Sequence, residues 1–331
     1  MRLDVEVSGI TFKNPIILGS AGICYDAYRM KKWIKAGFAG IVTKTTSKEP
    51  IEGLSPPRVF WYDEEREYMS GAEAWRNPGI KKMTASIKEV KEYANRENAV
   101  IIGSVGGHSP EEMAQLAAAM ENAGAGAIEI DLMCPGGAGY YDKQAKMEKS
   151  GAYWGSTPEL GAQVIRAVKA AVDVPVWPKF AMGNFLSKER METLDSSKPD
   201  AFPYACLAGG IWIDTDTGKP KPYGPEGAMC IPGPVKPLTI KRTADLARLT
   251  DTQLVPSGGL RRGLDVIECF MVGASAVEIC TVVYKYPDIM EKMIDEIEQY
   301  FIRLAYSSFE DIFKLSLQYL PKEPIPLATG Y

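Results

Sequence analysis

Apolar residues along this chain fall into short continuous runs, and most segments between these runs carry apolar residues at helical spacing. A short apolar run bounded by turn residues is typical of a buried strand. The runs that predict strands are 15–22, 40–45, 100–107, 127–134, 174–182, 201–207, 253–259 and 276–284. The segments that predict helices are 26–36, 78–95, 110–123, 158–171, 237–249 and 261–272.

Two of the predicted helices open on residues that satisfy the free N–H groups of a first turn. Ser109 precedes Pro110 and two glutamates, and Thr157 precedes Pro158 and Glu159. A hydroxyl cap, a first-turn proline and acidic residues at the positive helix end are expected there. Strands that alternate with helices in this way predict an α/β fold, the (β/α)8 TIM barrel, with a doubly wound open sheet as the alternative.

The alternation runs through the chain without a tandem repeat, a low-complexity segment or a linker. We therefore expect one domain over residues 1–331. A glycine- and tyrosine-containing loop at about 135–156 is expected to be a mobile lid over the site. The proline-rich end, about 320–331, is expected to be a surface tail.

Composition narrows the class of protein. Apolar residues make up 46% of the chain and charged residues 24%, as in a globular protein with a large core. The formal net charge of −4 argues against nucleic acid as the main partner. No apolar run approaches membrane-spanning length, and the first residues lack a signal-peptide pattern, which predicts a cytoplasmic location. The six cysteines are scattered without a Cys-x-x-Cys pair, so we expect reduced thiols and no metal site.

One predicted strand ends on a cysteine. Segment 128–133, with the sequence IEIDLM, leads into Cys134, and Pro135 and two glycines follow. Catalytic groups of α/β proteins gather at the ends of strands. Cys134 is therefore a candidate for chemistry, with a buried structural thiol as the alternative.

Two further strand ends predict a phosphate site. Gly258 and Gly259 stand between a strand and a helix, where glycine lets backbone N–H groups approach an anion. Cys280 and Thr281 close the last predicted strand, and barrels commonly bind phosphate after their seventh and eighth strands. A tight turn that binds no ligand is the alternative.

Two lysines, Lys44 and Lys179, lie in or at the end of predicted strands. A lysine that points into a barrel is costly unless an anionic group pairs with it. The negative N1–C2 edge of a reduced flavin would be such a group. The alternatives are a lysine that reaches solvent at the barrel mouth and the Schiff-base lysine of a class I aldolase.

In their order along the chain, these motifs resemble the family of flavin-dependent dihydroorotate and dihydropyrimidine dehydrogenases. Segments 14–22 and 42–45 resemble the family's first two strands, Cys134 falls on its proton-transfer cysteine, and Lys179 falls on its flavin-contacting lysine. The remaining matches are 77–79, 151–159, 233–237, 258–259 and 280–281. The shared order, rather than any one motif, carries the resemblance. It implies FMN as the cofactor.

The resemblance also implies roles for individual residues. Cys134 and Lys44 become the candidate catalytic residues, because flavin N5 exchanges a hydride with one carbon while Cys134 exchanges a proton with the neighbouring carbon. The candidate FMN-binding residues are Ser20, Ala21, Gly22, Lys44, Thr45, Ser104, Asp131, Lys179, Gly233, Gly258, Gly259, Cys280 and Thr281. The candidate substrate-binding residues are Asp131, Gly136 and Asn77. A homodimer is implied, and the electron partner is left open between a small acceptor and a partner subunit.

The chain departs from the family where that family holds its substrate with asparagines. Gly71, Asp131 and Gly136 stand at three of these positions, and the strand-six pair is absent around 202–204. Losing designed hydrogen-bond partners greatly weakens recognition. We therefore expect an FMN-dependent oxidoreductase that acts on a CH–CH or C=C bond of a different small substrate, cyclic ones included.

Aromatic residues are candidates to replace the amides. We expect Trp75, Phe202, Tyr204 and Trp212 to make the pocket more aromatic, with packing in the core as the alternative. Other flavin barrels rely on active-site histidines, and the single His108 lies at a predicted helix start.

Three other functions stay open on the sequence alone. The first is a true dihydroorotate or dihydropyrimidine dehydrogenase with an altered pocket. The second is a non-redox barrel lyase or aldolase that uses Lys44 or Lys179, and the third is a noncatalytic flavin or phosphate sensor.

Overall fold

The computed structural model describes residues 1–53, 56, 58–61, 69–71, 73, 75–134, 149–181, 187–206, 212–221, 229–230 and 235–323. Parallel strands close into one barrel, in which β15 pairs with β3. They are β3 (Ile16–Leu18), β4 (Gly40–Val42), β7 (Val100–Val105), β8 (Ala127–Asp131), β9 (Val176–Ala181), β10 (Ala201–Ala205), β14 (Gln253–Ser257) and β15 (Val277–Ile279). The predicted TIM barrel is confirmed, and each strand lies within one predicted run.

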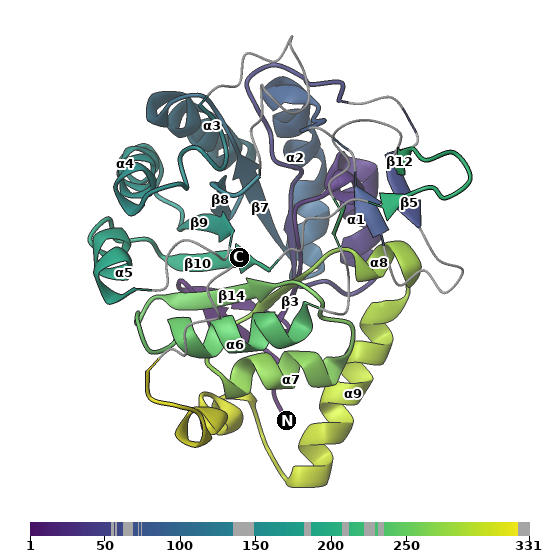
Figure 1. Ribbon diagram of the computed structural model, residues 1–331, viewed down its shortest axis with the longest axis vertical. Coiled ribbons are helices and arrows are strands. Elements are labelled where there is room, and N and C mark those ends of the chain that lie inside the picture. Colours follow the sequence, from purple (N-terminus) through teal and green to yellow (C-terminus); the bar gives the residue numbers. More distant parts are fainter. Residues whose placement is uncertain are drawn as a thin grey trace.

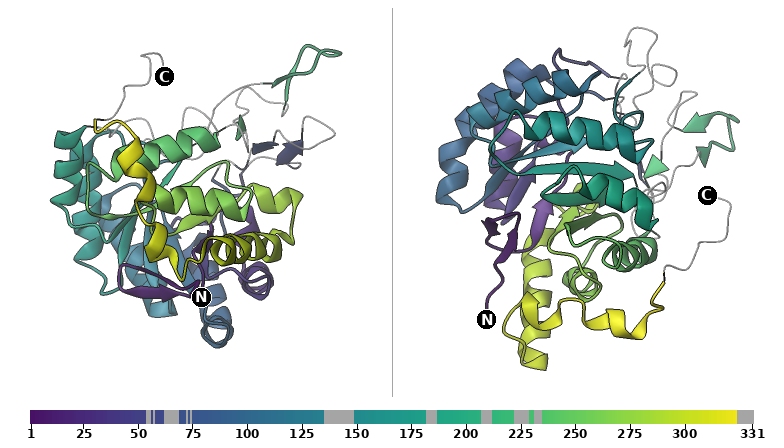
Figure 2. Two further views of the ribbon diagram at one scale, coloured as in Figure 1. Left: turned by 90° about the horizontal axis from the view of Figure 1, so that it is seen from below. Right: turned by 90° about the vertical axis from the view of Figure 1, so that its left-hand side faces the viewer.

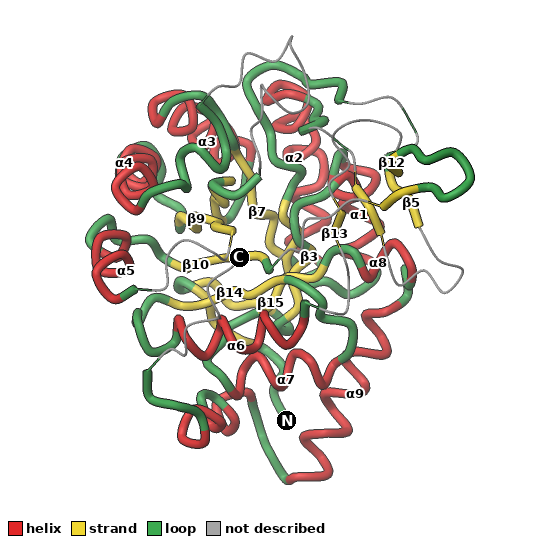
Figure 3. The backbone as a smooth tube through the Cα atoms, viewed as in Figure 1, coloured by secondary structure: helices red, strands yellow, loops and turns green. Residues whose placement is uncertain are grey.

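Helices surround the barrel as an outer ring (Figure 1, Figure 3). Those that follow successive strands are α1 (Ala27–Lys35), α2 (Gly79–Arg96), α3 (Pro110–Ala123), α4 (Pro158–Lys169), α5 (Lys188–Asp195), α6 (Lys236–Leu246) and α7 (Gly263–Met271). The chain then forms α8 (Val282–Lys285) and the longer α9 (Ile289–Leu304). Among the described residues, no helix has the length and apolar character that crossing a bilayer requires.

The predicted caps form as the sequence indicates. The Ser109 hydroxyl accepts a hydrogen bond from Glu112 N at 3.1 Å, and the Thr157 hydroxyl accepts one from Leu160 N at 3.3 Å. The predicted strand 276–284 is too long, because its second half forms α8. The sequence reading missed α5, which is short and mostly polar.

A hairpin closes the N-terminal end of the barrel. Its strands are β1 (Val5–Val7) and β2 (Ile10–Phe12). Phe12 is fully buried and lies 6.1 Å from the ring of Trp177, whose Nε1 donates to Ser8 Oγ at 3.0 Å. Figure 2 shows this hairpin at one end of the molecule and the short strands that stand over the barrel mouth at the opposite end.

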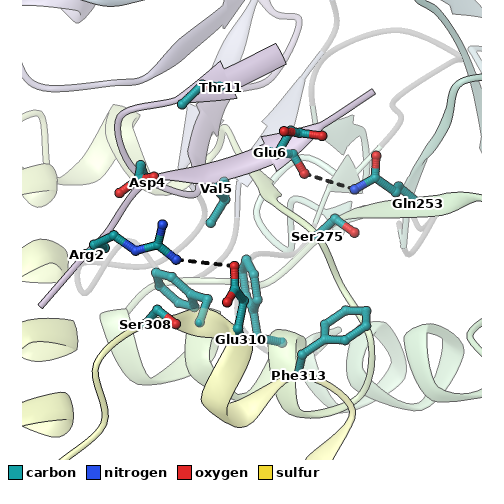
Figure 4. A pocket seen from close by; sticks show the side chains of 12 residues that line it. Arg2, Asp4, Val5, Glu6, Thr11, Gln253, Ser275, Ser308, Glu310 and Phe313 are labelled. Carbon is teal, nitrogen blue, oxygen red and sulfur yellow. Dashed lines mark hydrogen bonds and ion pairs between the residues drawn. The ribbon is translucent and has the colours of Figure 1, made fainter. Parts of the chain in front are cut away.

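A shallow pocket lies beside the hairpin (Figure 4). Arg2 pairs with Glu310 across it, and Gln253 donates to the Glu6 carbonyl. Both members of the ion pair are exposed to solvent.

Short strands stand over the opposite end. β5 (Val59–Trp61), β6 (Met69–Gly71) and β13 (Met229–Cys230) form a small antiparallel sheet, and β11 (Trp212–Ile213) pairs with β12 (Pro220–Lys221). These short strands lie outside the predicted apolar runs, so they were not predicted.

The inside of the barrel becomes polar near its C-terminal mouth. Side chains of a strand point alternately to its two faces. On β8 this places Ile128 and Ile130 against the helices and turns Glu129 and Asp131 inward. On β9, Lys179 points inward beside them. The strands therefore carry charged groups to one end of the barrel.

Candidate active site

A cavity of about 280 Å³ opens at the C-terminal ends of the barrel strands. The expected site residues that line it are Ser20, Ala21, Gly22, Lys44, Thr45, Asp131, Cys134, Lys179, Gly258, Gly259, Cys280 and Thr281. These residues come from both halves of the chain, so the fold brings the separate sequence motifs to one place. Val59, Met69 and Gly71 of the small sheet cover one side of it.

Two expected residues lie away from the cavity surface. Ser104 is fully buried beneath it and contacts Thr45 Oγ1 at 3.1 Å and Glu129 at 3.3 Å. Asn77 does not line the cavity, because its amide holds the chain before α2 through Ser47, Trp75 O and Gly79 N. Gly136 and Gly233 fall outside the described residues, as does most of the predicted lid.

The expected aromatic lining is wrong for three of its residues within the described chain. Ala205 lines the cavity, so the alternation along β10 turns Phe202 and Tyr204 outward. Tyr204 donates to Thr243 in α6, and Phe202 packs against Phe180. Trp75 packs beside Gly106 and Gly151 instead. The side chain of Trp212 falls outside the described residues.

Asp131 organises the turn that presents Cys134. Its Oδ1 accepts from Met133 N at 3.1 Å and from Cys134 N at 2.9 Å. Its Oδ2 accepts from Thr45 Oγ1 at 3.1 Å. A carboxylate thus does at this strand end what an asparagine oxygen could do, and it adds a negative charge. Asp131 forms no ion pair with Lys44, which is also among the described residues.

The thiol of Cys134 is a protonated group at neutral pH. Burial raises its pKa well above the ordinary value, and the negative charge of Asp131 raises it further, while Lys44 partly offsets this. A thiol in this state carries a proton that it can donate, and its raised pKa makes it a weaker acid than an ordinary thiol. The geometry and the protonation state together suit a general acid at the mouth of β8.

Hydroxyl groups join the ends of β3, β4 and β8. Ser20 Oγ accepts from Thr45 N at 2.9 Å and lies 3.2 Å from Thr45 Oγ1. Thr45 in turn reaches Asp131 and Ser104. Lys44 is buried beside this network, and its Nζ has no hydrogen-bond or ion-pair partner among the described residues. An unpaired buried ammonium needs a polar or anionic ligand.

Two carboxylates that were not predicted as site residues lie on the cavity floor. Lys179 Nζ forms an ion pair with Glu129 at 3.3 Å and another with Glu278. Burial alone would lower the pKa of Lys179, but Glu129 and Glu278 raise it above the ordinary lysine value. The signal in the sequence is a single glutamate between β-branched residues, as in Ile128-Glu129-Ile130.

The paired glycines after β14 form a close-fitting cradle. Gly258 and Gly259 have φ of +122° and +71°, which side chains rarely adopt. A Cβ on Gly258 would lie 2.4 Å from the Cys206 carbonyl oxygen, and one on Gly259 would lie 2.5 Å from Lys236 N. The neighbouring backbone therefore requires glycine at both positions, and both glycines line the cavity. Cys280 and Thr281 lie across the same cavity.

This molecule is a TIM barrel with a thiol, buried lysines and a glycine cradle at its C-terminal mouth. That arrangement is typical of barrel enzymes that bind a ligand at this end. The family model described as dihydroorotate dehydrogenase matches residues 2–301. The chain therefore belongs to the dihydroorotate dehydrogenase family, whose members are FMN-dependent oxidoreductases acting on CH–CH bonds.

Relatives agree with this assignment. The catalytic subunit of dihydroorotate dehydrogenase B (NAD(+)) from Methanocaldococcus jannaschii is 31% identical over 296 residues, which cover 89% of this chain and 92% of the relative. The corresponding subunit from Pyrococcus furiosus is 30% identical over 96% of this chain and 99% of its own length. A crystal structure of a dihydroorotate dehydrogenase from Eimeria tenella in complex with ferulenol has a TM-score of 0.75 at 17% identity, over 96% of this chain and 89% of its own, and shows the shared fold.

The described residues fit FMN, the cofactor of this family. Gly258 and Gly259 line the cavity after β14, where barrels commonly bind phosphate, and the side chains of Lys44 and Lys179 suit the polar edge of the FMN ring. When bound, FMN would supply hydride transfer. This enzyme is accordingly an FMN-dependent oxidoreductase of the dihydroorotate dehydrogenase type.

Proposed function

We propose that this enzyme oxidises or reduces a C–C bond in a small substrate that is uncharged or cationic, with Cys134 exchanging the proton opposite the flavin. The observation that carries the proposal is the charge of the cavity wall. Its described charged residues are two lysines, Lys44 and Lys179, and four acids, Glu73, Glu129, Asp131 and Glu278. A substrate carboxylate would enter a site that already has excess negative charge.

The charge balance separates this pocket from one suited to dihydroorotate, which carries a carboxylate. Lys179 is occupied by Glu129 and Glu278, so its charge is not free to bind an anionic substrate group. Like charges brought together in a partly desolvated site cost several kcal/mol, roughly, in binding. An uncharged ring avoids this cost.

The shape of the mouth supports the same choice. Gly71 lines the cavity, and a Cβ built on it meets no atom within 4 Å. Space is therefore left where a longer amide side chain would reach the substrate. The substrate must gain its contacts from Asp131 and from the residues that lie over the mouth.

Nothing in the site favours the Schiff-base alternative at Lys179. A lysine that attacks a carbonyl must first be a neutral amine. The neighbouring glutamates raise the pKa of Lys179 and keep it protonated. Redox chemistry at the flavin needs no neutral amine there.

We also propose that electrons reach or leave the site through a second subunit. The relatives at about 30% identity are named catalytic subunits of an NAD(+)-linked enzyme, a name that implies further subunits. The cavity opens on the side of the small sheet formed by β5, β6 and β13, which leaves this side of the barrel as the access route. Co-purification from the native source, followed by identification of bound chains, tests this proposal.

A matched pair of substrates tests the charge argument. Dihydrouracil and dihydroorotate share one ring and differ by the carboxylate. Added anaerobically to the FMN-loaded enzyme, dihydrouracil or another uncharged analogue is expected to bleach the flavin absorbance faster than dihydroorotate at equal concentration. Faster bleaching by dihydroorotate would contradict the proposed substrate class. A protein that stays colourless after FMN addition would contradict the flavin function itself.

A further inference from the structure

The cavity floor holds more negative charge than one lysine can balance. Glu129 and Glu278 are both 0% exposed, and Lys179 is 7% exposed. One ammonium group thus faces two carboxylates in a place that bulk water does not reach. A full uncompensated charge is unfavourable there, because water no longer solvates it.

The hydrogen bonds around the two carboxyl groups leave room for one more hydrogen. Glu129 accepts from Ser104 Oγ at 3.3 Å and from Lys179 Nζ at 3.3 Å. Glu278 contacts Lys179 through Oε2, whereas its Oε1 is buried without any hydrogen-bond partner. Both carboxyl groups contact the same Nζ of Lys179, which places them next to each other. Two ionised carboxylates cannot hydrogen-bond to each other, but a carboxylic acid and a carboxylate can.

We propose that Glu129 and Glu278 share a single proton and act as one titrating unit, the carboxyl pair, that balances the charge of Lys179. With one proton the group of three is neutral. The carboxyl pair therefore sets the charge of the cavity floor beneath a ligand.

The surroundings of the carboxyl pair favour retention of the proton. Burial raises the pKa of Glu129 well above its ordinary value, and the charge of Glu278 raises it further, against an opposing effect of Lys179. Asp131 on β8 adds negative charge nearby. Other titratable groups on this side are Lys44 after β4, Cys24 of the turn Gly22–Cys24, Cys280 after β15, and Glu73, Cys134, Cys206 and Tyr284 of the cavity wall.

Infrared spectroscopy of the chain without cofactor tests the shared proton. The expected result is a carbonyl stretch of a protonated carboxyl group near neutral pH that is lost in both Glu278→Gln and Glu129→Gln. Each variant keeps one carboxylate to pair with Lys179, so each should lose the proton while keeping the charge balance. Glu89→Gln, which alters an exposed glutamate paired with Lys31, is the matched control and should retain the band.

Other outcomes overturn the proposal. If neither single variant changes the protonated carboxyl signal, the carboxyl pair holds no proton. If the band survives in Glu278→Gln, the proton belongs to Glu129 alone and is not shared.

The pH dependence of stability gives an independent measurement. The folded chain binds one proton that the unfolded chain has lost above the ordinary glutamate pKa of about 4.3. Stability therefore falls as pH rises from that value toward the raised pKa of the folded state. We expect the wild-type folding constant, divided by that of Glu278→Gln, to fall about tenfold per pH unit in this window. Parallel pH profiles of the two proteins would refute a proton held by the pair.

The inference concerns the same cavity as the proposed function and rests on it only for its use with a ligand. Both measurements are made without FMN or substrate. A colourless protein with an intact carboxyl band would refute the flavin function alone, and a flavoprotein without the band would refute the shared proton alone.

Discussion

Asp131 and Cys134 show how one turn can set both the position and the protonation of a thiol. The carboxylate holds the backbone of Cys134 in place and raises the thiol pKa through its charge. The sequence predicted a reactive cysteine at this strand end, but the carboxylate beneath it became visible only through the hydrogen bonds.

Cys134→Ala is expected to keep FMN and to lose about 10²- to 10⁴-fold in turnover, the usual contribution of a positioned acid. Stopped-flow measurement of flavin bleaching and a visible spectrum check the two parts separately. Cys269→Ala is the control, because Cys269 is buried in α7 away from the cavity. Equal turnover of the two variants would remove Cys134 from the proton transfer.

The raised thiol pKa also predicts the shape of the pH profile. Where the thiol donates its proton, the rate should hold through neutral pH and fall in the alkaline range as the thiol ionises. This fall in rate at alkaline pH should be absent in Cys134→Ala. A limb below pH 7 in the wild type would show that another group controls the reaction.

Gly258 offers a second test at the scale of one residue. Gly258→Ala should weaken FMN binding at least tenfold, because its Cβ would meet the Cys206 carbonyl at 2.4 Å while φ is +122°. Such strain costs about 1–3 kcal/mol. Fluorescence quenching of FMN measures the affinity. Gly9→Ala has a similarly unfavourable φ but open space around it, so it should lose stability without losing FMN.

Among the elements, the N-terminal hairpin stabilises the barrel and takes no part in the chemistry. Phe12 is fully buried, and Gly40 and Ile17 lie close around its ring, with Trp177 beyond. Phe12→Ala should reduce the free energy of unfolding by about 3–5 kcal/mol through the cavity it leaves. Urea unfolding measures this, and the neighbouring exposed Thr11→Ala should change stability by less than about 0.5 kcal/mol. A small loss in Phe12→Ala would mean that the barrel end is closed by other contacts.

The barrel strands could be predicted because each lies in a continuous apolar run, and most helices after them because their apolar residues recur at helical spacing. The strands β5, β6 and β13 lie outside these runs and exist through their partners. The predicted inward direction of Phe202 and Tyr204 was wrong for a related reason. A one-residue change of parity moves a side chain to the other face of its strand, and only the register with β9 and β14 fixes it.

The same limit applied to the site. Lys44, Lys179 and the glycines could be placed at the cavity because each marks a strand end. Glu129 and Glu278 lie within strands, and no local pattern shows that β8 and β15 bring them to one ammonium group. Charge balance is a property of several strands together, so it appears only in the closed barrel.

At the scale of the whole molecule, the cavity ties together ends of β3, β4, β8, β9, β10, β14 and β15. A ligand that contacts so many strands should stabilise the barrel as one unit. FMN at a hundredfold excess over its Kd should raise the free energy of unfolding by about 2.7 kcal/mol. Thermal unfolding with and without FMN checks this, and riboflavin, which lacks the phosphate, should give a smaller rise. Equal rises would remove the phosphate cradle from the binding site.

The hairpin at the closed end has a kinetic consequence. Phe12 and Trp177 are buried at that end of the barrel, whereas the carboxyl pair lines the cavity at the mouth. A ligand bound at the mouth would then separate the shared proton of the carboxyl pair from solvent. Exchange of that hydrogen with deuterium would proceed at the rate at which the ligand dissociates. The exchange rate would therefore measure the residence time of each ligand.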